Sequence, residues 1–202
     1  MAKLIGEVAR ECGAGAVYCN TIAQAPHQAA EQQLEATLAS LGVDSQSFPG
    51  DLLVPPAVIR NKEGRGLRVF TPFWRAFTKD LAPPRASGPP DRIISPSQSP
   101  KSDDVRDWEL SQTKPDWSRG LGETWQPGES GARARLAEFA KNGLATYAID
   151  RNSLDKDGTS RISPHLAFGE ISPAACWRAA TAAARGKGAN DQSIETFMKE
   201  LV

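Results

Sequence analysis

Residues 158–173 of this chain read Gly-Thr-Ser-Arg-Ile-Ser-Pro-His-Leu-Ala-Phe-Gly-Glu-Ile-Ser-Pro. Three hydroxyl side chains, those of Thr159, Ser160 and Ser163, cluster beside a glycine and directly before a predicted helix start. Free backbone N–H groups at such a turn favour an anion, and the hydroxyls and the Arg161 guanidinium can add donors and charge for a phosphate. The pattern predicts an anion site, with a solvated loop carrying two helix caps as the alternative.

Two Ser-Pro pairs mark helix starts around this run. Ser163-Pro164 and Ser172-Pro173 each place an N-cap residue before a proline at the first helical position. The second helix is expected to end at Gly186, and Ser193 to cap a last helix. Before the run, residues 132–147 are predicted to form one continuous helix with a wide apolar face. That face consists of residues at helical spacing: Leu136, Phe139, Ala140, Gly143, Leu144 and Tyr147.

The first 50 residues alternate between helix and strand patterns. Apolar residues at helical spacing predict helices over 4–11 and 26–41, the second ending at Gly42. Short apolar runs predict buried strands over 16–19 and 43–48. This alternation indicates a doubly wound α/β sheet. Because the pattern begins inside a helix and two strands make no stable open sheet, we expect the chain to lack its first strands.

Proline and tryptophan dominate residues 83–131. Prolines break regular structure throughout this stretch: Pro83, Pro84, Pro89, Pro90, Pro96, Pro100, Pro115 and Pro127. Exposing Trp108, Trp117 and Trp125 would leave a large apolar area in water. We therefore expect a long connection pinned onto a domain surface, with a Pro-rich ligand for an aromatic groove as the alternative.

The composition excludes several classes of protein. The 24 Lys and Arg residues balance 24 Asp and Glu residues, which argues against a protein held on nucleic acid by bulk charge. No run approaches the roughly 20 apolar residues of a membrane helix, and the N-terminus has no signal-peptide pattern. Cys12, Cys19 and Cys176 form no Cys-x-x-Cys pair. His27 and His165 stand apart from other metal ligands. We expect a cytoplasmic protein with no metal site and no membrane association.

Four residues beside the predicted anion loop have both a structural and a functional interpretation. Tyr147 closes the apolar face and Arg151 follows one turn later, so core packing and an ordinary surface charge are the simpler interpretations. Glu200 follows Phe197 by three residues on the predicted last helix, about 60° around its axis. Glu200 is therefore either solvated or lines a cavity whose wall is Phe197.

Residues 158–173 resemble the flavin-binding signature of the DNA photolyase/cryptochrome family. Residues 69–74, Val-Phe-Thr-Pro-Phe-Trp, resemble a segment near the end of that family's α/β domain, and the Pro- and Trp-rich stretch resembles its interdomain loop. Residues 197–202, Phe-Met-Lys-Glu-Leu-Val, resemble the start of a helix that the family continues into Trp-Arg-Glu-Phe. The resemblance spans the whole chain, is strongest with bacterial cyclobutane pyrimidine dimer photolyases, and covers only the middle of a family member, so we expect a fragment.

The resemblance implies a domain layout. Residues 1–80 would be the C-terminal part of a doubly wound, Rossmann-like α/β antenna domain. Residues 81–130 would be the interdomain connector, and residues 131–202 the first helices of an all-α FAD-binding domain.

The resemblance also implies FAD as the cofactor and damaged DNA as the partner of a monomer. The implied FAD-binding residues are Tyr147, Thr159, Ser160, Arg161, Ile162, Ser163 and Phe197. Glu200 matches a glutamate that hydrogen-bonds the pyrimidine dimer and is the implied catalytic residue. Arg151 matches an arginine that touches the DNA backbone, which positions DNA without reading its sequence.

The implied activity is light-driven DNA repair. In the family, reduced flavin absorbs a blue photon and gives an electron to a dimer flipped out of the duplex, whose cyclobutane ring then splits. Glu200 would stabilise the dimer anion as a donor when protonated. The alternatives are a cryptochrome-like blue-light photoreceptor that binds FAD and signals through partners, and a truncated product without activity.

Residues 18–27 depart from the family pattern near the antenna pigment. The family usually has Trp-Asn-Arg-x-Tyr there, and this chain has Cys19, Thr21 and Ala23 in place of the Trp, Arg and Tyr. These departures weaken the expectation of an antenna folate or deazaflavin.

Overall fold

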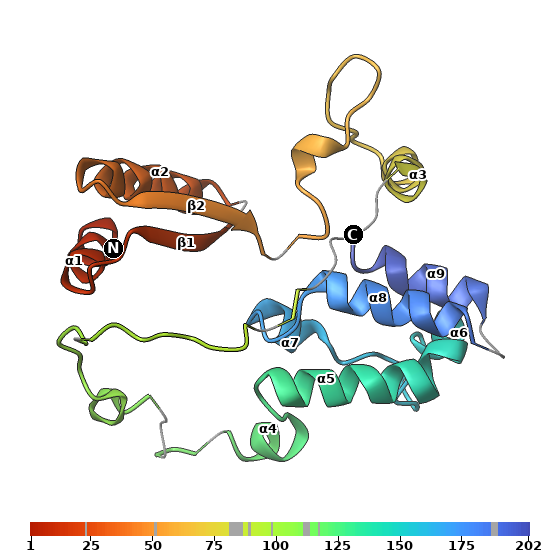
Figure 1. The fold of residues 1–202 in the computed structure, drawn as a ribbon. Coiled ribbons are helices and arrows are strands. Elements are labelled where there is room, and N and C mark those ends of the chain that lie inside the picture. The colour runs from red at the N-terminus through yellow and green to blue at the C-terminus, as the bar shows by residue number, and fades with distance from the viewer. Residues whose placement is uncertain are drawn as a thin grey trace. The chain divides into compact units, whose positions relative to one another are not determined.

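The structure is a computed structural model of the 202-residue chain. It describes residues 1–22, 24–50, 52–80, 87–88, 90–97, 99–110, 114–116, 118–186 and 190–202. The chain forms two compact units (Figure 1). Unit 1 comprises Met1–Gly50 and Gly88–Thr124, and unit 2 comprises Asp51–Ser87 and Trp125–Val202.

Unit 1 contains a small parallel sheet with two helices. Its elements are α1 (Ala2–Glu11), β1 (Ala16–Thr21), α2 (Ala25–Ser40) and β2 (Asp44–Pro49). The two strands pair in parallel from Ala16 opposite Asp44 to Thr21 opposite Pro49. The predicted alternation of helix and strand is therefore confirmed, but the expectation that the strands are buried is wrong, because no residue of β1 or β2 is buried. Gly42 ends α2 with a φ of 69° that favours glycine.

The core of unit 1 lies between its helices and β1. Ala9 of α1, Leu34 and Leu38 of α2 and Val43 are buried together, and Val17 of β1 packs against them. Leu34 and Leu38 belong to the apolar spacing that predicts α2. The apolar stripe expected for α1 is largely wrong, because Leu4 and Val8 are exposed and α1 buries Gly6 and Ala9 instead.

The Pro- and Trp-rich stretch has only two short helical elements among its described residues, η2 (Val105–Trp108) and α4 (Arg119–Thr124). Trp108 is 56% exposed, so the expectation that it anchors the stretch is wrong. Trp125 is half-buried, with its ring 6.4 Å from that of His165. Trp117, Pro83, Pro84 and Pro89 lie outside the described residues.

Unit 2 is helical. Its elements are η1 (Pro56–Val58), α3 (Phe70–Asp80), α5 (Glu129–Glu138), η3 (Phe139–Gly143), η4 (Leu144–Thr146), α6 (Tyr147–Asp150), α7 (Ser163–Ala167), α8 (Pro173–Ala184) and α9 (Asp191–Lys199). Its main core joins α5, η3, α6, α8 and α9. The buried members are Ala132, Leu136, Phe139, Leu144, Tyr147, Ile162, Ile171, Cys176, Ala180, Ile194 and Phe197.

The continuous helix predicted over 132–147 is broken after α5. A π turn occupies η3, where the Phe139 ring lies so close to Gly143 that a Cβ on Gly143 would be 2.9 Å from Phe139 Cδ2. Such a turn adds one residue to the helical repeat and rotates the residues after it around the axis. Phe139, Leu144 and Tyr147 consequently all reach the same core, although the helix does not run straight through.

The two predicted Ser-Pro caps have different outcomes. Ser172 caps α8 as expected, because its Oγ accepts a hydrogen bond from the Ala175 N–H at 3.2 Å. Ser163 is instead the first residue of α7, and Ile162 occupies the N-cap position without a side-chain bond. The expected cap at Ser163 is therefore wrong, and its hydroxyl is left for other partners.

The apolar segment around residues 69–77 forms α3 and packs on α8. Phe77 is fully buried, and its ring meets Trp177 edge to face at 5.1 Å. Ala174 of α8 belongs to the same cluster as Leu53 and Ile59. Residues 52–80 thus belong to the helical unit in this structure, while the domain boundaries at residues 80 and 130 stay predictions. None of the helices described here combines the length and apolar content of a membrane span.

Candidate functional site

The hydroxyl-rich run forms the loop between α6 and α7, and α5 holds it from one side. Arg135 of α5 donates from Nε to the carbonyl oxygen of Ser160 at 2.9 Å and from Nη2 to that of Thr159 at 3.0 Å. A trans peptide places its C=O and N–H on opposite sides. The N–H groups of Ser160 and Arg161 therefore face away from Arg135.

The backbone around Arg161 has two successive conformations of opposite hand. Arg161 has a φ of 52°, and Ile162 follows in a right-handed conformation with φ of −90° and ψ of −15°. Two successive residues of opposite hand turn their own N–H groups and that of the next residue towards one concavity. One of these three groups, the Ile162 N–H, is already bonded to Ser160 Oγ. Ile162 is 1% exposed, which anchors this shape in the core of unit 2.

The predicted hydroxyl donors lie on the same loop. Thr159 and Ser163 are exposed, and neither hydroxyl has a partner among the residues that the structure describes. Ser160 Oγ lies 3.4 Å from the Ile162 nitrogen and accepts its N–H. Because α7 has only five residues, its helix dipole is small and would attract an anion only weakly. The predicted attraction for an anion therefore rests on the N–H groups of the loop.

The Arg161 side chain has a protein partner instead of a free charge. Its Nε lies 2.9 Å from Asp157 Oδ1, and Asp157 also lies 3.7 Å from Arg135 Nη2. The expected contribution of the Arg161 charge to an anion is therefore offset by Asp157, and the backbone at Arg161 is the part that suits a phosphate.

Gly158 closes the loop against the end of α6. A Cβ at Gly158 would lie 2.2 Å from the carbonyl oxygen of Asp150, so only glycine fits. Lys156 Nζ donates to Asp150 Oδ1 at 2.8 Å, and hydrogen bonds from Lys156 and then Thr146 hold the pKa of Asp150 below its usual value. These contacts fix the segment that leads into the loop at 158–163.

Tyr147 and Phe197 meet in an aromatic cluster. Their ring centroids are 5.6 Å apart and perpendicular, and Phe139 lies 5.4 Å from Tyr147 and 4.9 Å from Phe197. Tyr147 is 7% exposed and Phe197 2% exposed. Burial raises the pKa of the Tyr147 hydroxyl, so it stays protonated at neutral pH.

The structure brings the two predicted DNA-contact residues together. Arg151 Nη1 donates to Glu200 Oε1 at 2.5 Å, and its guanidinium lies 5.2 Å from the centre of the Tyr147 ring. The hydrogen bond to Glu200 is the main cause that raises the pKa of Arg151. Glu200 directly follows α9 as its C-cap residue. Tyr147, Arg151, Phe197 and Glu200 thus form one side-chain group.

Ser193 has a role that the sequence pattern missed. The expectation that Ser193 caps α9 is wrong, because the cap is Asn190, whose side chain accepts from the Ser193 N–H at 3.2 Å. Ser193 is 1% exposed, and its Oγ accepts from the Ala148 N–H at 3.1 Å. This bond ties α9 to α6 and so sets Glu200 beside Arg151.

The buried His165 of α7 pairs with Glu170, whose carboxylate also accepts from the Gly128 N–H at the start of α5, and no sequence signal indicated this link. His165 is 4% exposed, and its Nδ1 lies 2.5 Å from Glu170 Oε2. The bond to His165, followed by one from the Gly128 N–H, holds the pKa of Glu170 below its ordinary 4.5. Within the described residues no cluster of ligands suits a metal ion.

Replacing Glu170 should change how stability depends on pH. The lowered pKa means that the ionised Glu170 stabilises the fold above pH 4.5 and loses this effect as pH falls through the lower folded value. Glu170→Gln should therefore lower the thermal midpoint at pH 6–7 and leave it nearly unchanged near pH 3. Thermal melts across this range test it, with Glu129→Gln as an exposed control. A constant difference at every pH would contradict the ionic role.

The residues that replace the family's antenna pattern are engaged within unit 1. Cys19 Sγ lies 3.3 Å from Ser47 Oγ on the neighbouring strand. Thr21 donates to Glu31 Oε1 at 3.1 Å. Ala23, the third departure, lies outside the described residues.

Comparisons with known proteins show which proteins the chain resembles. Residues 1–91 match the family model described as DNA photolyase. The deoxyribodipyrimidine photo-lyase of Agrobacterium fabrum is 38% identical over 200 residues, which cover 99% of this chain and 41% of that protein. Cryptochrome-1 of Arabidopsis thaliana is 27% identical over 201 residues, or 96% of this chain and 29% of that protein. A crystal structure of a bacterial class III photolyase from Agrobacterium tumefaciens superposes with a TM-score of 0.91 at 36% identity, covering 99% of this chain and 41% of that one.

The chain is similar along nearly its whole length to members of the DNA photolyase/cryptochrome family. It spans about two fifths of the length of the Agrobacterium relatives that it matches. The predicted resemblance is thereby confirmed, and so is an α/β fold with a small parallel sheet and many helices.

Proposed function

We propose that this chain carries the FAD-diphosphate loop and part of the lesion contact of a light-dependent DNA repair enzyme, a deoxyribodipyrimidine photo-lyase. The observation that carries the proposal is the loop at 158–163. Its N–H groups at Ser160 and Arg161 face away from the helix that holds it, and its Thr159 and Ser163 side chains are exposed. FAD, when bound, supplies the light-absorbing electron donor of the repair reaction.

The loop at 158–163 suits the diphosphate of FAD better than Tyr147 and Phe197 suit its flavin ring. Thr159 and Ser163 lack protein partners among the described residues and would donate to phosphate oxygens, with the loop N–H groups beside them. Tyr147 and Phe197, proposed to border the flavin ring, are covered by protein in this structure. The role of Ile162 is to anchor the loop through its buried side chain.

Arg151 and Glu200 would divide the work of holding DNA. Arg151 suits a backbone phosphate, because a guanidinium donates to phosphate oxygens. Glu200 would hydrogen-bond the pyrimidine dimer, yet its Oε1 accepts from Arg151 in this structure. Donation by Glu200 to a base therefore requires its other oxygen, or requires Arg151 to turn to a phosphate first. We propose that DNA binding breaks the Arg151–Glu200 ion pair, so that Arg151 contacts a phosphate and Glu200 contacts the dimer.

A chimera tests the proposed repair activity. In it, residues 1–202 replace the matching segment of the Agrobacterium fabrum photo-lyase, and light-dependent loss of pyrimidine dimers is measured. Glu200→Ala should lower repair per bound dimer and weaken dimer binding by roughly 1–3 kcal/mol, with flavin content unchanged. Arg151→Ala should weaken binding of damaged and undamaged DNA alike and reduce the salt slope by about one.

The second candidate is a cryptochrome-like photoreceptor, which the similarity to Cryptochrome-1 supports. A chimera that retains stoichiometric flavin but repairs no dimers under blue light, with Arg151 and Glu200 intact, would favour this candidate over repair.

A further inference from the structure

We infer that Arg135 is a positioning residue that holds the 158–163 loop in its anion-binding conformation. The inference rests on the proposed function, since it concerns the same diphosphate loop. Arg135 has no direct contact with the proposed ligand, because both of its hydrogen bonds go to the opposite side of the loop peptides.

Arg135 is anchored for this role. It lies on α5, between the buried Ala132 and Leu136, and its side chain is 26% exposed. Two different nitrogens of one planar guanidinium reach two successive carbonyl oxygens, those of Thr159 and Ser160. A planar fork fixes both peptide planes at once, which a single ammonium group cannot do.

The conformation that Arg135 holds is strained. Arg161 is one of only two non-glycine residues with positive φ among the described residues. Positive φ is unfavourable for a side chain with a Cβ. Rotating the Ser160–Arg161 peptide by half a turn would change the φ of Arg161 and relieve this strain. The bond from Arg135 Nε to the Ser160 carbonyl opposes that rotation.

The orientation of these peptides decides which charge the loop presents. In the observed state, the partial positive N–H groups of Ser160 and Arg161 face the proposed ligand side. After rotation of the Ser160–Arg161 peptide, the Ser160 carbonyl oxygen would face that side in place of the Arg161 N–H and repel an anion. Arg135 therefore sets the sign of the loop's local potential.

Arg133 provides a matched control on the same helix. It lies two residues before Arg135, its side chain is 74% exposed, and it pairs with Glu129 of α5 itself. Arg135→Lys and Arg133→Lys both keep the net charge of the chain and replace a planar guanidinium by a single ammonium group. Only the first removes contacts to the loop.

The experiment uses the 202-residue chain and pyrophosphate as the probe. NMR reports the sign of φ at Arg161 through its backbone carbon shifts and its HN–Hα coupling, and a titration to about 20 mM follows the amides of Ser160 and Arg161. We expect Arg135→Lys to lose the positive-φ signature without ligand and to bind pyrophosphate about tenfold more weakly, since loop donors are lost. Arg133→Lys should keep the positive-φ signature of Arg161 and should bind pyrophosphate with an affinity within twofold of that of the unmodified chain.

Thr159→Ala combined with Ser163→Ala separates this inference from the proposed function. It should weaken pyrophosphate binding and leave φ at Arg161 positive. If Arg135→Lys keeps positive φ or keeps full affinity for pyrophosphate, Arg135 is no positioning residue and the inference is overturned. If the unmodified chain shows no pyrophosphate shifts while φ responds to Arg135→Lys, the diphosphate function fails, and with it the role of Arg135 in binding.

Discussion

Phe197→Ala should lower the free energy of unfolding of this chain by about 3–5 kcal/mol, the usual cost of truncating a buried aromatic ring. Phe197 is 2% exposed and contacts Phe139 and Tyr147, which lie on two other elements of unit 2. Domains are stable by only about 5–15 kcal/mol. The variant should therefore unfold at much lower urea concentration, measured by circular dichroism at 222 nm.

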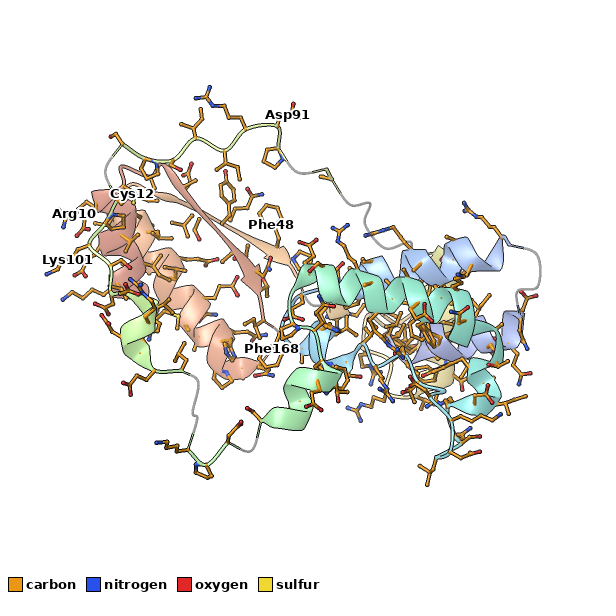
Figure 2. The ribbon with its side chains drawn as sticks, turned by 90° about the horizontal axis from the view of Figure 1, so that it is seen from below. Arg10, Cys12, Phe48, Asp91, Lys101 and Phe168 are labelled. Carbon is orange, nitrogen blue, oxygen red and sulfur yellow. The ribbon has the colours of Figure 1, made fainter. Side chains whose placement is uncertain are left out.

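Phe168→Ala is the matched control for Phe197→Ala. Phe168, labelled in Figure 2, is 82% exposed at the end of α7. Its removal should change the free energy of unfolding by less than about 0.5 kcal/mol. A loss below about 1 kcal/mol for Phe197→Ala would show that the ring is not a core anchor.

The fold of unit 1 was predictable because its signals are local. The helices that became α1 and α2 follow apolar spacing, and Gly42 stops α2 through a positive φ that other residues rarely adopt. The parallel pairing of β1 with β2 follows from the helix that connects them.

Unit 2 exposes the limits of local patterns. The spacing from Leu136 to Tyr147 fits a straight helix, yet a π turn at Phe139–Gly143, with the Phe139 ring close against Gly143, interrupts it. Serine is a common N-cap residue, but the Ser193 hydroxyl accepts a hydrogen bond from the N–H of Ala148, 45 residues earlier in the chain. Contacts of such sequence separation come from tertiary packing, which overrides local preference.

The candidate site divides in the same way. Composition marks the hydroxyl run as a candidate anion loop, and the resemblance supplies FAD and the roles of Tyr147 and Phe197; all of these assignments stay predictions. Arg135 was missed because an arginine on a polar helix face carries no signal of the Thr159 and Ser160 carbonyls 24 and 25 residues later. Only the fold shows that a charge on α5 orders this loop.

Gly158→Ala should destabilise unit 2 and disable the loop together. A Cβ there would lie 2.2 Å from the carbonyl oxygen of Asp150, 2.4 Å from its carbonyl carbon and 2.8 Å from its Cβ. Two of these atoms are backbone and cannot rotate away, so the end of α6 or the loop must move. Overpacking of this kind costs about 1–3 kcal/mol, and more where backbone must shift. Urea unfolding measures this cost.

Gly122→Ala provides the contrast for Gly158→Ala. Gly122 lies in α4, is exposed, and a Cβ added there would have nothing within 4 Å. Because alanine favours helix over glycine, this variant should be neutral or more stable by about 0.5–1 kcal/mol. Movement of the loop in Gly158→Ala should also shift the amide resonances of Ser160 and Arg161, which Gly122→Ala should leave in place. Equal stability of both variants, with the loop resonances unmoved, would mean that Gly158 is not held against Asp150 and that the glycine of the signature serves another purpose.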